Sequence, residues 1–185
     1  MYKRQGYKKG AKFESGNFKY QVTKIATATG SKKTKGVVTV VGLSKKGKKA
    51  SKLSVGTSVS KTVSKVKATY KINKLGKNAF KGAKAKKVTL GKTIKSIPAG
   101  AFKNCKKVKK ISVGKNVKTI GKNAFKGCKK LKTITLANKK VTIKKGAFAG
   151  LNTKKITIKA PKMSKKALKK LSLIHISEPT RLQLI

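Results

Sequence analysis

The chain has 185 residues, of which 52 are Lys or Arg, 2 are Asp or Glu and 1 is His, so that its formal net charge is +50. General acid–base catalysis and metal coordination depend on paired or clustered His, Cys, Asp and Glu. His175 and Glu178 lie in a C-terminal tail that we set aside below, and the remaining glutamate and two cysteines are too few to form such a group. We therefore expect no enzyme, no metal site and no cofactor, and a lone lysine nucleophile is the one catalytic alternative.

Both ends of the chain resemble translated sequencing-adapter DNA. Leu171–Arg181 has the sequence expected from a transposase adapter, and Tyr2–Gln5 matches the reverse complement of its first codons. We therefore interpret 1–5 and 171–185 as adapter-derived and expect them to make no consistent core contacts. The remaining fragment, 6–170, has 49 lysines, one glutamate and no arginine. Because Met1 belongs to the adapter, the sequence carries no information on a signal peptide.

Residues 6–70 alternate apolar and polar side chains in the manner of β-strands. The alternation runs through Phe18–Val22, Val38–Val40, Leu53–Val55 and Val66–Tyr70. Turns are predicted between these segments, one of them at Lys45–Lys49. We predict a β-rich N-terminal cap at 6–70, because the terminal unit of a repeat array must cover its open edge.

An Ala-Phe pair recurs four times in residues 71–162. The spacings between its phenylalanines, Phe80, Phe102, Phe125 and Phe148, are 22, 23 and 23 residues, which lie within the period of leucine-rich repeats. We predict that this phenylalanine column forms the core. A second apolar frame follows each phenylalanine, and its members are Val88 and Leu90, Ile111 and Val113, Ile134 and Leu136, and Ile156 and Ile158.

The segment Ile120–Leu136, with the sequence IGKNAFKGCKKLKTITL, resembles the BspA-like leucine-rich repeats of bacterial surface proteins. Its lysine bias is similar to that of members from gut Firmicutes. The resemblance covers about half of the chain and implies a cell-surface or secreted protein of adhesive or undefined role, with no catalytic residue to transfer. The first and fourth units depart by one residue in the turn after Phe, and Lys140 stands where Ile or Val is expected, so the register of the fourth unit is open.

Each repeat is predicted to contain one strand and one short turn. The alternation of Ile134, Thr135 and Leu136 predicts a strand that stacks in parallel on its neighbours. Asn123–Lys129 is too short for a stable isolated helix, so we expect a single helical or 3₁₀ turn there. The predicted fold class is α/β, a leucine-rich-repeat solenoid of about four repeats at 71–162. A C-terminal capping helix is predicted to begin at 163–170, with Ser164 as its N-cap.

Two cysteines occupy one repeat position. Cys105 and Cys128 stand where the flanking repeats have Ala83 and Leu151. Such a set of residues predicts a small apolar core site, and a disulfide between adjacent repeats is the alternative.

Outward-facing strand residues are predicted to form columns, because parallel strands lie about 4.8 Å apart. The candidate polyanion-binding residues are Lys87, Lys110 and Lys155 in one column, which also holds Thr133, together with Lys109 and Lys132. The candidate hydroxyl column consists of Thr89, Ser112, Thr135 and Thr157. Lysines at this pitch repel one another, and a single glutamate cannot neutralise them, so the missing partner is predicted to be external and anionic.

Candidate partners are teichoic acid or another envelope polymer, host acidic glycans, a host or bacterial surface protein, and nucleic acid. Arginine is the residue of bidentate base recognition, and its absence from 6–170 argues against sequence-specific nucleic-acid binding. No segment approaches the roughly 18 apolar residues of a membrane span. We predict a non-enzymatic, cell-surface or extracellular scaffold that binds anionic polymers. The alternatives are a cytoplasmic, non-specific nucleic-acid-binding protein and a structural surface stalk.

Overall fold

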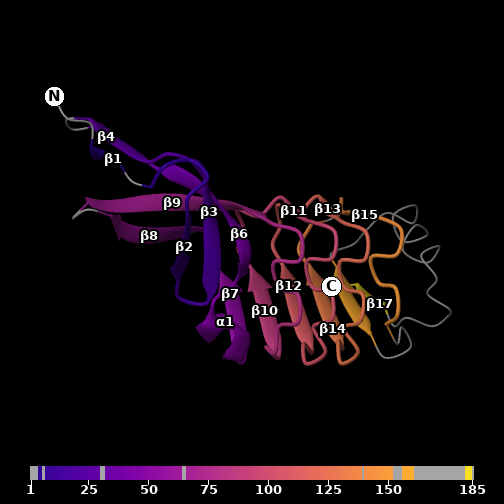
Figure 1. Ribbon diagram of the computed structural model, residues 1–185. Coiled ribbons are helices and arrows are strands. Elements are labelled where there is room, and N and C mark those ends of the chain that lie inside the picture. Colours follow the sequence, from indigo (N-terminus) through magenta and orange to yellow (C-terminus); the bar gives the residue numbers. More distant parts are fainter. Residues whose placement is uncertain are drawn as a thin grey trace.

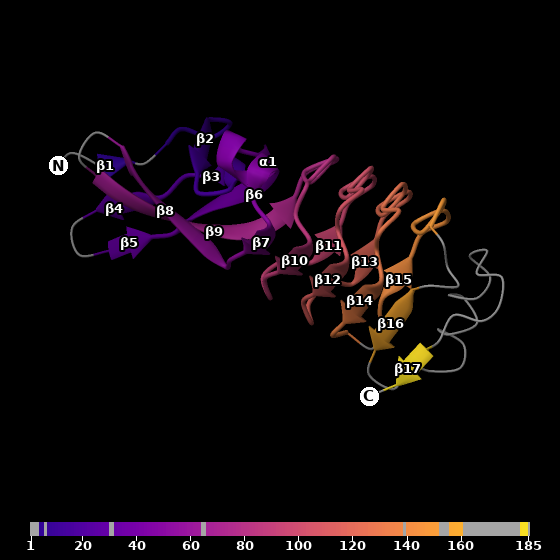
Figure 2. The same cartoon turned by 90° about the horizontal axis from the view of Figure 1, so that it is seen from below.

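A computed structural model of the chain describes residues 4–5, 7–29, 32–63, 66–138, 140–151, 156–160 and 182–184. Figure 1 shows a twisted group of strands in the amino-terminal part, followed by a stack of similar coils. Figure 2, in which the molecule is seen from below, shows that the coils align their strands in rows that run along the stack. One hydrophobic core extends through both parts.

A five-stranded sheet forms the amino-terminal part. Its strands, in spatial order, are β2 (Lys12–Ser15), β3 (Phe18–Lys24), β6 (Gly36–Leu43), β9 (Val66–Leu75) and β8 (Ser58–Val63). β6 and β9 are parallel, and the other neighbours are antiparallel. The predicted alternation is confirmed in β3, where Phe18, Tyr20 and Val22 are buried and Lys19 is exposed. A small separate sheet contains β1 (Arg4–Gln5), β4 (Thr27–Thr29) and β5 (Lys32–Thr34).

Tyr20 lies among the aromatic side chains of this sheet. Its ring centroid is 5.3 Å from that of Phe13 and 6.2 Å from that of Phe18. Burial disfavours the charged phenolate and raises the pKa of Tyr20 to about 12. An unfolded tyrosine titrates near pH 10, so the folded state holds this proton more tightly than the unfolded state does.

Tyr20 should therefore make stability depend on alkaline pH. Its contribution is fully present below the unfolded pKa and is lost as the pH rises through the folded pKa. The difference in unfolding free energy between the wild type and Tyr20→Phe should shift by about 2 to 3 kcal/mol against the wild type between roughly pH 9 and pH 12.5. Urea denaturation of both proteins measures this difference, and lysine titration cancels because it is common to both. A difference that stays constant over this range would contradict the burial of the phenol.

Residues Lys45–Lys49 form the helix α1, and the turn predicted for this segment was wrong. Ser44 is the N-cap: its Oγ accepts a hydrogen bond from the Gly47 backbone N–H at 3.0 Å and donates one to the Gly16 carbonyl at 2.8 Å. Gly47 is buried against the backbone of Asn17. The helix therefore depends on the β2–β3 turn, which is distant in the sequence, and a local composition of lysine and glycine does not reveal this support.

Two parallel sheets form the stack. The larger one contains, in spatial order, β7 (Lys52–Val55), β10 (Lys87–Leu90), β12 (Lys110–Val113), β14 (Thr133–Leu136), β16 (Thr157–Ala160) and β17 (Leu182–Leu184). The smaller one contains β11 (Ser96–Ile97), β13 (Thr119–Ile120) and β15 (Thr142–Ile143). The predicted parallel pairing of successive repeats is confirmed, and the inward residues Val88, Ile111 and Ile134 are buried in register.

The repeat sheet begins earlier than the predicted array. β7 lies within 6–70, yet Leu53 and Val55 pair with Val88 and Leu90 as the first strand of the stack. β9, in turn, runs across the predicted boundary between residues 70 and 71. The amino-terminal sheet and the stack are therefore interleaved along the chain. The sequence did not assign β7 to the repeats, because the repeats were recognised by their Ala-Phe pair and no such pair precedes β7. Pairing with β10 requires only an extended backbone.

The phenylalanine column is confirmed as core. Successive ring centroids along Phe80, Phe102, Phe125 and Phe148 are 4.7, 5.4 and 5.3 Å apart, with interplanar angles of 18°, 12° and 10°. Phe18 approaches Phe80 edge-on at 5.9 Å and joins the amino-terminal sheet to the column. The backbone follows the same order, because the N–H groups of Phe80, Phe102 and Phe125 each donate to the alanine carbonyl of the next repeat.

The turns that carry these phenylalanines are not helical or 3₁₀, in contrast to the prediction. Each begins at a residue with positive φ, which is Asn78 (56°), Gly100 (64°), Asn123 (55°) or Gly146 (71°). A hydrogen bond then runs from the residue after Phe back to the carbonyl of that positive-φ residue. Left-handed backbone interrupts a right-handed helix, and Asn and Gly tolerate it best. The described residues therefore contain almost no helix, and α1 is the one that they form.

Two described strands come from the ends that were interpreted as adapter-derived. β1 pairs with β4, and β17 pairs with β16. Both are edge pairings, in which the free backbone groups of an edge strand accept any extended segment. The adapter origin of the ends stays a prediction. The predicted capping helix at 163–170 lies outside the described residues.

Candidate functional site

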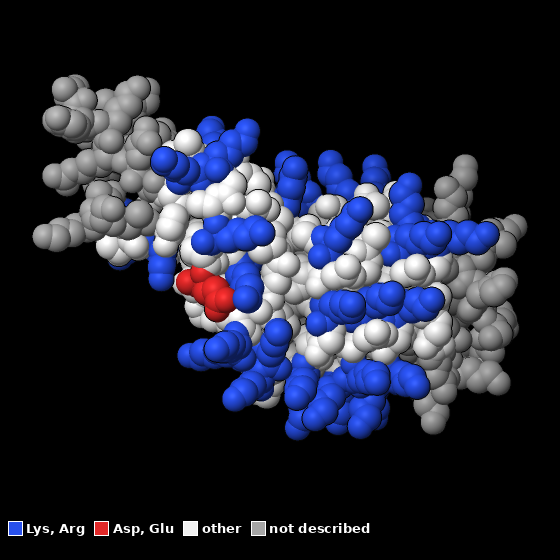
Figure 3. All heavy atoms as spheres, in the orientation of Figure 1, with Lys and Arg blue, Asp and Glu red and all other residues white. Residues whose placement is uncertain are grey.

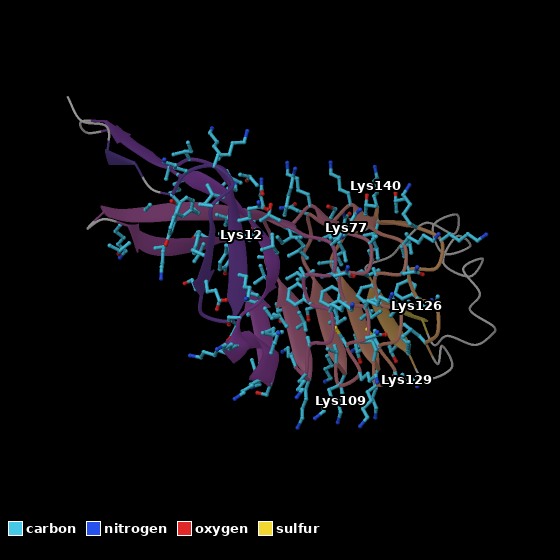
Figure 4. All side chains as sticks on the ribbon, in the orientation of Figure 1. Lys12, Lys77, Lys109, Lys126, Lys129 and Lys140 are labelled. Carbon is cyan, nitrogen blue, oxygen red and sulfur yellow. The ribbon has the colours of Figure 1, made fainter. Side chains whose placement is uncertain are left out.

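Ten exposed lysines line the side of the stack where the chain enters the strands of the larger sheet. We call this row the lysine edge. It consists of Lys84, Lys86 and Lys87 in the first repeat, Lys106, Lys107, Lys109 and Lys110 in the second, and Lys129, Lys130 and Lys132 in the third. Figure 4 places Lys109 and Lys129 at the lower margin of the stack, and Figure 3 shows basic side chains along that margin.

Backbone pairing holds the lysine edge in register. The Lys109 N–H donates to the Lys86 carbonyl at 2.8 Å, and the Lys132 N–H donates to the Lys109 carbonyl at 2.9 Å. On the adjoining strands Lys87 pairs with Lys110, and on its other side with Lys52. Each repeat therefore places its lysines directly beside those of the next repeat.

The first predicted column is confirmed in part. Lys87, Lys110 and Thr133 are neighbours on β10, β12 and β14, and Lys87 and Lys110 are exposed. The fourth member of the column was wrong, because Thr157 and not Lys155 pairs with Thr133. Lys155 itself lies outside the described residues. Lys109 and Lys132 stand beside this column, and their part in binding stays a prediction.

The hydroxyl column is correct in three repeats and wrong in the fourth. Thr89, Ser112 and Thr135 are neighbours, but Thr157 pairs with Thr133, and Lys159 takes the place beside Thr135. The successive partners Lys110, Thr133 and Thr157 show that the last interval is one residue longer than the preceding one. Because of this extra residue, Ile158 and not Ile156 is the equivalent of Ile134. The apolar pattern had matched Ile156 to Ile134 and Ile158 to Leu136.

Seven further lysines beside the predicted ones were missed. The two lysine pairs in the turns after the cysteines, Lys106-Lys107 and Lys129-Lys130, were not among the candidate residues, and Lys52 was placed in the cap. The others are Lys84 and Lys86. The signal that could have found them is their recurrence at the repeat spacing, because turns in successive repeats stack as closely as strands do.

The stack carries almost no compensating negative charge. The one acidic side chain in the described residues is Glu14 in the amino-terminal sheet, where its Oε1 lies 2.8 Å from Lys19 Nζ. Figure 3 shows this acidic surface apart from the lysine rows of the repeats. Two ammonium groups separated by the strand spacing of about 4.8 Å would repel by about 0.9 kcal/mol in water, which exceeds RT. The lysine edge therefore favours an anionic neighbour.

The cysteines form a different kind of site. Cys105 and Cys128 are both buried and free, as expected for a small core position. The Cys105 Sγ donates to the Phe80 carbonyl at 2.9 Å, and the Cys128 Sγ donates to the Phe102 carbonyl at 3.0 Å. The hydrogen bond with Cys105 and burial together raise the pKa of Cys128, so this thiol stays protonated. The two hydrogen bonds therefore join adjacent repeats, and burial keeps both sulfur atoms away from the surface.

The described part of the chain contains no group of three or more His, Cys, Asp or Glu side chains that could hold a metal ion. Among the helices of that part, none is long and apolar enough to cross a membrane.

The geometry defines a protein of parallel stacked repeats with an aromatic ladder in its core. A family model for the BspA type leucine rich repeat region matches residues 58–181 in six copies. The chain therefore belongs to the BspA-type leucine-rich-repeat family, which confirms the resemblance found in the sequence. The matched region begins at β8 and is longer than the predicted array of about four repeats at 71–162.

Comparison with solved structures finds the crystal structure of the pneumococcal vaccine antigen PcpA. The similarity covers 85% of this chain and 44% of that chain, at 17% sequence identity and a TM-score of 0.45. The present chain thus spans less than half the length of PcpA. No curated protein sequence matches the chain.

Proposed function

We propose that the chain is part of a non-enzymatic, cell-surface repeat scaffold that binds anionic polymers through the lysine edge. The observation that carries the proposal is the register of the repeats, which places exposed lysines side by side in consecutive coils. Membership of the BspA-type family supports the scaffold role and the surface location. A bound anionic polymer would supply the negative charge that the stack almost entirely lacks.

Recognition by charge, and not by shape, follows from the residue type. Lysine presents a hydrated point charge on a flexible stem, whereas bidentate recognition of a planar anion or a base edge uses arginine. The six phenylalanines are buried and cannot stack on the bases of a single strand. Teichoic acid, an acidic glycan and DNA should therefore compete for the same surface with little discrimination.

Salt dependence tests the proposal. Replacing Lys109, Lys110 and Lys132 together by Gln removes three neighbouring charges of the lysine edge. For duplex DNA the slope of log affinity against log salt should fall by about 2 to 3, since each lost phosphate contact removes about 0.9. Fluorescence anisotropy at a series of salt concentrations measures the slope for DNA, heparin and teichoic acid. Each polymer should also raise the thermal midpoint of the wild type by mass action.

The hydroxyl column provides a matched control. Replacing Thr89, Ser112 and Thr135 by Ala changes the same number of neighbouring residues and leaves the charge intact. The slopes of this variant should equal those of the wild type. Affinity for one polymer that is insensitive to salt, and that is lost on changing a single residue, would instead indicate a stereospecific pocket.

A further inference from the structure

The lysine edge does not stop at the first repeat. β7 is the strand that precedes β10 in the larger sheet, and the Lys86 N–H donates to the carbonyl of Ser51, which stands just before β7. α1 ends two residues before Ser51 and so occupies the place that the lysine-rich turns occupy in the later coils. Figure 1 shows α1 beside β7 at the lower margin of the molecule.

The exposed side of α1 has the same chemistry as the edge. Lys45, Lys46, Lys48 and Lys49 are exposed, and Gly47 faces the β2–β3 turn. Lys52 then continues the column of Lys87 and Lys110. The basic row thus passes without interruption from α1 through three repeats, across four coils of the stack.

The spacing of charge along this row matches that of a polyelectrolyte. Ten lysines in three repeats, at about 4.8 Å for each repeat, give one positive charge for about every 1.4 Å of the stack axis. Duplex DNA carries one negative charge for about every 1.7 Å of its axis. The opposite margin of the larger sheet is sparser, because the segments that leave β10 and β12 carry two lysines each: Lys92 and Lys95, and Lys115 and Lys118.

We propose that the lysine edge and α1 form a track for one extended, linear polyanion that runs along the axis of the stack, at right angles to the strands. The ligand class is a flexible chain with phosphate or sulfate groups along its length. This inference rests on the proposed polyanion binding, and it adds the direction of the bound chain and the dependence of affinity on chain length. A long chain makes ionic contacts with successive coils, whereas a compact anion of similar charge contacts a single coil.

A series of linear phosphate oligomers of about 3, 6, 12 and 25 units, compared with the cyclic hexaphosphate, tests the length dependence by isothermal titration at several salt concentrations. The salt slope should rise with chain length and level off once the chain spans the four coils, and the cyclic compound should behave like the shortest chain. Heparin oligosaccharides of graded length give the same comparison for sulfate. The series with the lower dissociation constant at equal charge identifies the preferred anion.

Two variants with the same total charge test the place of the track. In the first, Lys107, Lys109 and Lys110 are replaced by Glu, which interrupts the track at its middle coil. In the second, Lys92, Lys95 and Lys118 on the opposite margin are replaced by Glu. The first variant should lose at least about tenfold in affinity for the longest chain, and the second less than about threefold, because nearby charge dominates over screened distant charge. Thermal midpoints check that both remain folded.

The outcomes separate the two proposals. Equal losses in both variants, or a cyclic compound that binds as tightly as the longest chain, would overturn the track while leaving charge-driven polyanion binding intact. Failure of every polyanion to bind the wild type in a salt-dependent way would overturn both. If a variant does not fold, the same comparison is made with Lys→Gln at the same positions.

Discussion

Phe125→Ala should destabilise the protein by about 3 to 5 kcal/mol, a large part of the stability of a typical domain. The side chain is fully buried, and its ring is stacked between those of Phe102 at 5.4 Å and Phe148 at 5.3 Å. Truncation leaves a cavity that both neighbours border, and the coils cannot close it without breaking the backbone pairing between repeats. Urea denaturation and the thermal midpoint measure the loss.

Two substitutions serve as controls for Phe125. Lys126→Ala changes the next residue, which is exposed, and should alter stability by less than about 0.5 kcal/mol. Phe148→Ala should cost less than Phe125→Ala, because Phe148 is 5% exposed and has one described ring neighbour. An unchanged midpoint for Phe125→Ala would remove the aromatic ladder as the basis of the stack.

Gly47→Ala should destabilise the protein by about 2 to 3 kcal/mol, although alanine is the better helix former. A Cβ at this position would lie 1.9 Å from the backbone carbonyl oxygen of Asn17, which is far inside contact distance. Relief requires α1 to move away from the β2–β3 turn, and this movement would break the Ser44 hydrogen bond to Gly16. Chemical denaturation of the purified variant measures the loss.

Gly42→Ala is the matched control for Gly47. Gly42 lies in β6, close to α1, and a Cβ there would meet nothing nearer than the Lys19 side chain at 3.9 Å. Alanine also has less freedom to lose on folding than glycine has. Stability should therefore stay the same or rise slightly. Equal losses at both glycines would show that α1 is not held by close approach to Asn17.

The closeness of the α1 packing also bears on the proposed track. α1 supplies the first group of lysines in the basic row, and its position depends on Gly47 and Ser44. A variant that displaces α1 without unfolding the repeats should shorten the track by one coil. Its effect should therefore appear with long polyanions and not with short ones.

The sequence by itself determined the repeat, its period and its core. Phe80, Phe102, Phe125 and Phe148 recur at nearly constant spacing, and a constant spacing can be satisfied only if equivalent residues stack. The strands at Ile111–Val113 and Ile134–Leu136 followed from their alternation, and the lysine columns followed from the stacking. Family membership was visible in the same residues.

Tertiary structure decided the features that depend on distant partners. β7 joins the repeat sheet because it pairs with the edge of β10. α1 is held in place because its N-cap Ser44 donates a hydrogen bond to the Gly16 carbonyl and Gly47 packs against Asn17. The fourth repeat shows the same limit. The apolar pattern placed Thr157 beside Thr135, whereas the backbone hydrogen bonds pair it with Thr133. Periodicity specifies which residues are equivalent within regular units. Hydrogen bonds and packing with the rest of the chain set the register across an insertion and decide whether a local segment forms a helix or a strand.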